Sequence, residues 1–106
     1  MSFKWPSKDS GETLDYSLDW SRFLRTSESL SSVVWSIDDE DGVKQTFTPP
    51  NTINTLINGG NTNSSTVATI TLSGGTNNAT YKLYCTVTLN SGYVAERSVT
   101  LRIKER

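Results

Sequence analysis

The sequence contains no histidine and a single cysteine, Cys85. Histidine is the side chain that most often serves as a general acid or base, so its absence removes the commonest catalytic group. One cysteine excludes an intrachain disulfide. Cys85 lies on the apolar side of an alternating segment and is interpreted as a small core residue, because a reactive thiol would need a nearby base or cation. No enzymatic activity is predicted.

Long apolar runs are also absent. No segment approaches the ~20 apolar residues of a membrane span, and the opening sequence MSFKWPSKDSGE lacks the apolar stretch of a signal peptide. We therefore expect that the protein is synthesised in the cytoplasm and does not associate with a membrane. The net charge of −1 argues against general nucleic-acid binding, which relies on an excess of cations.

An acidic run at residues 38–41, followed by Gly42, is the one cluster that suggests metal binding. Hard cations need several convergent oxygen ligands, but the spacing of an EF-hand would require an acid where Ile37 stands. Asp-Gly is a strong hairpin signal, so the segment is interpreted as a solvated turn, with weak calcium binding as the alternative. Neither a metal nor a cofactor is predicted.

The sequence does contain a regular alternation of apolar and polar residues. Successive side chains of a strand point to opposite faces, so each alternating run predicts a strand with one buried face. Turn signals separate the runs, which is typical of an all-β, immunoglobulin-like antiparallel β-sandwich of about seven strands. The main predicted strands cover about residues 13–20, 30–37, 43–47, 66–72, 80–89 and 94–104.

Two stretches are ambiguous. Within residues 51–64, Ile53 and its apolar neighbours are compatible with a short edge strand, whereas residues 58–63 are predicted to be a loop because Asn and Gly tolerate positive φ. In the last strand the apolar parity changes near residues 95–97, which is consistent with a β-bulge.

Residues 1–11 are predicted to form an extended N-terminal tail, and residues 12–106 a single immunoglobulin-like domain. Proline and glycine disfavour regular structure in the tail. Two large aromatic residues, Phe3 and Trp5, nevertheless stand there. Clustered exposed apolar side chains usually mark a contact, so these rings are expected either to fold back onto the domain or to meet a partner.

Charge is distributed unevenly along the chain. Residues 1–41 hold nine acids and four bases, and the remainder holds two acids and six bases. Asp15 and Asp19 lie on the outer face of the first main predicted strand, and Arg102 and Lys104 on that of the last. If these strands are neighbours, the charges form cross-strand pairs. The alternative is solvated charge of little energetic value.

Four segments of the sequence are more specific in combination than any one of them is alone. They are FKWP at residues 3–6, LDYSLDWSRFL at 14–24, a tryptophan in the second main predicted strand at Trp35, and ERSVTLRIKER at 96–106. Together they extend over essentially the whole chain. In this order they resemble a family of small tailed-bacteriophage virion proteins described as fibre–tail adaptors.

The resemblance implies a non-enzymatic structural protein of the virion, made in the host cytoplasm, that docks a fibre or appendage to the tail or neck. Its partners would be other virion proteins of the tail, neck, fibre or capsid, with the adaptor present in several copies. The resemblance further implies partner contacts through Phe3, Trp5, Arg22 and Phe23. The alternative is that these two segments close one end of the sandwich.

Two other functions stay open at the level of the sequence. A capsid decoration protein would share the structural class. A carbohydrate-binding module would stack sugars on exposed aromatic rings, for which Trp5, Phe23 and Tyr93 are available once Trp20 and Trp35 are assigned to the core by their parity.

Overall fold

The computed structural model describes residues 2–104, with side chains from residue 4 onward. In this part of the chain all regular structure is β, and no helix has the length and hydropathy to cross a membrane. The strands are β1 (Ser2–Lys4), β2 (Leu14–Asp19), β3 (Leu30–Asp38), β4 (Lys44–Thr46), β5 (Thr52–Ile53), β6 (Leu56–Asn63), β7 (Val67–Gly74), β8 (Thr80–Leu89) and β9 (Val94–Arg102).

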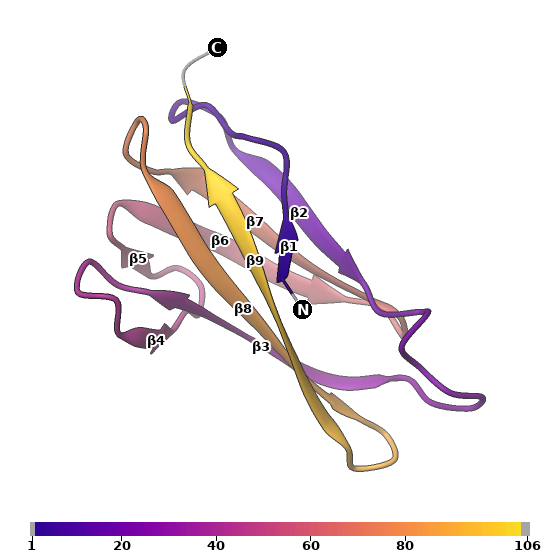
Figure 1. The fold of residues 1–106 in the computed structure, drawn as a ribbon. Coiled ribbons are helices and arrows are strands. Elements are labelled where there is room, and N and C mark those ends of the chain that lie inside the picture. The colour runs from indigo at the N-terminus through magenta and orange to yellow at the C-terminus, as the bar shows by residue number, and fades with distance from the viewer. Residues whose placement is uncertain (1, 105–106) are drawn as a thin grey trace.

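The strands form two facing sheets (Figure 1). One has the order β1-β9-β8-β3-β4 and the other the order β2-β7-β6-β5. The chain changes sheet between β1 and β2, between β2 and β3, between β4 and β5, and between β7 and β8; the last three changes are the interleaving of an immunoglobulin-like sandwich. The predicted fold class is confirmed. More strands form than the seven or so predicted, because residues 2–4 and 56–63 also pair.

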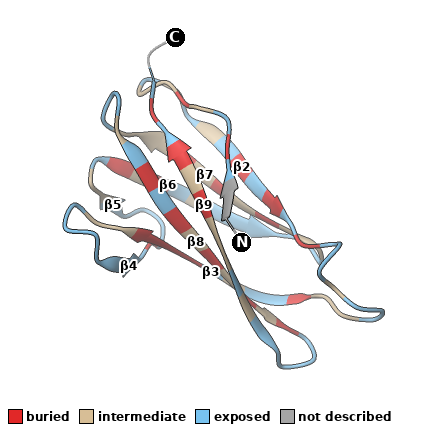
Figure 2. Cartoon of the chain, in the orientation of Figure 1, coloured by how far each residue is buried: buried red, intermediate tan, exposed pale blue. Residues whose placement is uncertain are grey.

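The core lies between the sheets and follows the alternation seen in the sequence. The inward residues of β8, from Tyr81 to Leu89, are all buried, while their neighbours are partly or fully exposed (Figure 2). Trp35 on β3 pairs in register with Cys85 on β8, and both are buried. The interpretation of Cys85 as a core residue is therefore confirmed.

The N-terminal segment runs alongside β9. Strand β1 pairs with β9 in parallel, Trp5 N–H donates to the Thr100 carbonyl at 2.9 Å, and Lys8 N–H donates to the Arg102 carbonyl at 3.0 Å. The backbone of Phe3 pairs with Val99, but its side chain lies outside the described residues. The division between a tail of residues 1–11 and a domain of residues 12–106 stays a prediction.

Trp5 folds back onto the domain, which is one of the two alternatives for the N-terminal aromatics. Its ring is only 7% exposed. It stacks on Tyr16 of β2, with ring centroids 4.8 Å apart, and lies 5.7 Å from the ring of Trp35 on β3. Its indole N–H donates to the Ser17 carbonyl at 3.3 Å. Trp5 thus contacts residues of both sheets.

Residues 58–63 form most of β6, so the predicted loop is wrong. A register shift between Asn58 and Gly60 marks a bulge in the pairing of β6 with β7. Asn58 is fully buried at an inward position, where its amide donates to the Phe47 carbonyl at 2.9 Å and accepts from Gly60 N–H at 3.0 Å. A satisfied asparagine replaces the apolar residue that would have signalled the strand.

The bulge expected near residues 95–97 does not form. The β8–β9 register is continuous from Thr80 opposite Arg102 to Thr88 opposite Val94. The parity of the strand is therefore kept, and Arg97 occupies an inward position. It is tolerated there because its guanidinium lies over aromatic rings instead of in an aliphatic core.

The proposed cross-strand pairing of Asp15 and Asp19 with Arg102 and Lys104 is wrong. Strand β2 pairs with β7 in one sheet, and β9 lies in the other. Asp15 instead accepts a hydrogen bond of 2.6 Å from the hydroxyl of Thr71. Asp15 and Asp19 on β2 therefore do not pair with Arg102 and Lys104.

We predict that the loss of stability caused by Cys85→Ala becomes smaller at alkaline pH. Burial raises the pKa of the Cys85 thiol from its ordinary value of 9.0 to about 12. Between these values the unfolded chain has lost the thiol proton while the folded chain keeps it, so stability falls as the pH rises. A pKa shift of this size lowers the free energy of unfolding by at most ~4 kcal/mol once the pH has passed both values.

The measurement is urea unfolding of the natural protein and of Cys85→Ala at pH 7 and at pH values above 9. The free-energy advantage of the natural protein over the variant should shrink as the pH rises, because the other titrating groups are common to both. An advantage that stays constant with pH would contradict the burial of a protonated thiol.

We predict that Trp5→Ala lowers the free energy of unfolding by ~3–5 kcal/mol, as expected for removal of a large buried ring. Tyr93→Ala, which removes a ring that is 58% exposed, is the matched control and should change it by less than ~1 kcal/mol. Chemical denaturation measures both. Equal effects of the two substitutions would mean that the N-terminal segment is not docked in solution.

Candidate partner-binding site

Three connections meet at one end of the sandwich (Figure 1). They are the loop of residues 20–29 between β2 and β3, the turn of residues 64–66 between β6 and β7, and the turn of residues 90–93 between β8 and β9. We call these three segments the loop end. It contains two of the residues that the sequence predicts for partner contact, Arg22 and Phe23.

Hydrogen bonds join the three connections into one unit. Trp20 N–H donates to the Thr66 carbonyl at 2.8 Å, which ties the first loop to the β6–β7 turn. Asn90 donates from its backbone to the Ser29 carbonyl and from its side chain to the Ser27 carbonyl, both at 3.0 Å. The long loop is therefore supported at both of its ends.

Phe23 is presented on a tight turn directly after β2. Asp19 begins the turn by accepting the Ser21 N–H at 2.9 Å, and this bond is the main reason why the pKa of Asp19 lies below its ordinary value. Phe23 N–H then donates to the Trp20 carbonyl at 2.9 Å. The Phe23 ring meets the buried Trp20 ring edge-on, at 5.5 Å and 79°, and stays 42% exposed.

Arg97 supports these two rings from β9. Its guanidinium lies 5.2 Å from the ring centroid of Trp20 and 5.2 Å from that of Phe23. A cation over an aromatic face stabilises the arrangement and limits the freedom of the exposed ring. Sequence reasoning did not identify Arg97 as a site residue. The only signal was the break in apolar parity near residues 95–97.

A second exposed ring, Tyr93, stands on the β8–β9 turn, where the Arg25 guanidinium lies 5.1 Å from its centroid. Glu28 positions this arginine by accepting its backbone N–H at 2.8 Å, with the side chains 3.9 Å apart. Glu28 also accepts the Ser91 hydroxyl at 2.8 Å. These bonds, the one from Arg25 N–H first, lower the pKa of Glu28, so it carries a negative charge at neutral pH.

A cleft of about 200 Å³ lies between these features. Of the five large hydrophobic residues that are exposed in the described part of the chain, three lie at or beside the loop end: Phe23, Tyr93 and Val94. Aromatic residues and arginine are enriched at protein–protein interfaces and dominate their energetics. The cleft is lined by Phe23, Arg25, Glu28, Leu89, Tyr93 and Val94.

The four predicted contact residues are not brought together. Arg22 and Phe23 are exposed at the loop end. Trp5 lies beside Thr100 in the C-terminal part of β9, whereas Phe23 lies against Arg97 nearer its start. The two segments therefore do not close one end of the sandwich together.

The loop end offers groups that suit binding. Across residues 2–104, no group of three or more His, Cys, Asp or Glu side chains is arranged to hold a metal ion. The arrangement supplies exposed rings, a cation at each ring and a small cleft, which suit contact with another protein surface.

Comparison with known protein families agrees with this geometry. Residues 8–102 match a family described as podophage GP4 fiber-tail adaptor protein gp77. No curated protein matches the sequence. The family match includes every strand from β2 to β9 and thus most of the chain. The chain belongs to the podophage fibre–tail adaptor family.

Proposed function

We propose that this fibre–tail adaptor docks its partner through the loop end. As a member of its family the protein is a component of the phage virion and binds other virion proteins, such as those of the tail and fibre. The observation that supports the loop end as the contact is the gathering there of Phe23, Tyr93 and Val94, which are 42%, 58% and 65% exposed.

The exposed rings are held in place before any partner arrives. Phe23 is fixed between Trp20 and Arg97, and Tyr93 is covered by Arg25. Binding therefore costs less conformational entropy than it would with free side chains. Full burial of one large apolar side chain contributes ~1.5–3 kcal/mol, so two such rings can anchor an interface.

Arg22 and Phe23 thus remain our proposed contact residues, joined by Tyr93 and Val94. The Trp5 ring is engaged in the core, so a partner contact through it would require the N-terminal segment to move. We propose that the contribution of this segment to binding, including that of Phe3, is indirect.

We further propose that the adaptor is not an enzyme, is made in the host cytoplasm and is present in several copies in the particle. The absence of histidine and the burial of the single thiol, whose pKa is raised to about 12, support a role without catalysis. No observation favours capsid decoration or carbohydrate binding over the adaptor role.

We predict that Phe23→Ala combined with Tyr93→Ala weakens binding to the fibre or tail partner by ~10-fold or more, because both anchors are lost. The measurements are the affinity of the purified adaptor for tail and fibre proteins, and the amount of fibre in particles that carry the variant. The substitution Val34→Ala, at a β3 residue that is 46% exposed and lies outside the loop end, is the matched control.

Thermal unfolding of both variants verifies that each is folded before binding is compared. Unchanged fibre content with the double variant, or an equal loss with Val34→Ala, would contradict the assignment of the contact to the loop end.

A further inference from the structure

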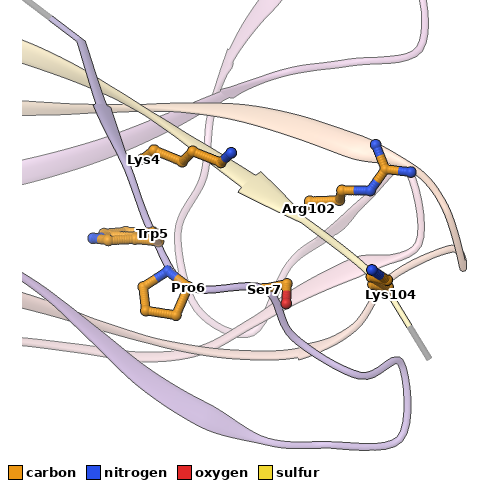
Figure 3. A pocket seen from close by; sticks show the side chains of 6 residues that line it. All are labelled: Lys4, Trp5, Pro6, Ser7, Arg102 and Lys104. Carbon is orange, nitrogen blue, oxygen red and sulfur yellow. The ribbon is translucent and has the colours of Figure 1, made fainter. Parts of the chain in front are cut away.

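A second cleft, of about 520 Å³, lies along β1 and the end of β9, away from the residues that line the loop end (Figure 3). Its volume falls within the range of ~300–1,000 Å³ that is usual for ligand sites. The residues that line it are Lys4, Trp5, Pro6, Ser7, Arg102 and Lys104. We call it the basic cleft.

Within the described residues, the three cations of the basic cleft have no acidic partner. Lys4, Arg102 and Lys104 are exposed, and none has a carboxylate within salt-bridge distance among residues 2–104. The parallel pairing of β1 with β9 places Lys4 opposite Thr100, two residues before Arg102, and so gathers the charges. Like charges around one cleft repel one another, and a bound anionic group would relieve that repulsion.

The same chain carries an acidic group that is equally uncompensated. The turn between β3 and β4 contains Glu40 and Asp41, both exposed, and neither carboxylate has a partner in the described structure. Asp39 fixes the shape of this turn by accepting the N–H groups of Asp41 and Val43 at 3.0 Å and 2.9 Å. The turn is thus a preformed projection with two available negative charges.

The basic cleft and the acidic turn lie at opposite edges of one sheet. Strand β1 is the outer strand on one side of the five-stranded sheet, and β4 is the outer strand on the other (Figure 1). Two complementary surfaces on opposite sides of a protein give a head-to-tail contact that repeats from copy to copy. We infer that the basic cleft takes the acidic β3–β4 turn of a second copy of this chain.

This contact uses none of the residues that line the cleft at the loop end. Self-association and partner docking are therefore separable, and the inference does not rest on the proposed function. Because every copy in a head-to-tail series is related to the next in the same way, each copy would present its loop end in an equivalent position.

We predict that charge reversal on either side abolishes self-association. One variant is Glu40→Lys with Asp41→Lys, and the other is Lys4→Glu with Lys104→Glu. Sedimentation velocity at about 0.02 M and 0.5 M salt compares them, because screening weakens exposed ion pairs at high salt. The apparent mass of the natural protein should exceed the monomer mass of 11.7 kDa at low salt and equal it at high salt.

Each variant alone should remain monomeric at low salt, whereas an equimolar mixture of the two should associate again, because the reversed turn of one then fits the reversed cleft of the other. Lys82→Glu is the matched control, since Lys82 is exposed on the same sheet but does not line the cleft. It should associate as the natural protein does, as should the loop-end variant with Phe23→Ala and Tyr93→Ala.

Two results would overturn the inference. One is a natural protein that stays monomeric at low salt and high concentration, together with a mixture of variants that does not associate. The other is a loss of incorporation into particles with the cleft variant but not with the turn variant, which would assign the cleft to an acidic segment of another virion protein. Thermal unfolding at high salt verifies that all variants are folded.

Discussion

The contact between Trp5, Tyr16 and Trp35 is the interaction on which the rest of the structure depends. Tyr16 belongs to the four-stranded sheet and Trp35 to the five-stranded sheet, and the Trp5 ring lies against both. Docking of this ring holds the N-terminal segment beside β9, so that β1 can pair and Lys4 can approach Arg102. The segment is also held by the three-residue β1, by backbone hydrogen bonds to β9 and by the fully buried Lys8, whose ammonium donates to the Asp9 and Gly74 carbonyls at 2.8 Å. Burial of the Trp5 ring adds to these bonds in opposing the conformational entropy of the segment.

The loop end follows a different principle, in which a buried ring supports an exposed one. Trp20 is 2% exposed, and its side chain also lies within interaction distance of the buried Cys85 thiol. Its ring meets the Phe23 ring edge-on and lies under the Arg97 guanidinium. The core of the domain thus holds the exposed Phe23 ring in place.

Sequence reasoning succeeded where one physical rule acted alone. Strand β8 has the predicted bounds, residues 80–89, because its alternation is unbroken and both neighbouring strands pair along it. It failed at Asn58, where a polar side chain satisfied by hydrogen bonds took an inward position, and at Arg97, where aromatic rings replaced an aliphatic environment. The partners of Asp15 could not be predicted, because alternation determines which face a residue occupies but not which strand lies beside it.

The candidate site shows the same limit. The resemblance to a family predicted Phe23 as a protein contact, whereas the sequence offered Tyr93 only as an exposed ring for stacking sugars. The structure places Tyr93 at the same end as Phe23, with the Arg25 guanidinium over its ring. The sequence shows the charge imbalance between residues 1–41 and 42–106, but only the order of the strands shows where these charges lie on the surface. Because β1 and β4 are the opposite edges of one sheet, a sequence with a net charge of −1 still presents a positive side and a negative side. An adaptor built this way can separate the surface that selects its partner from the surface that orders its own copies.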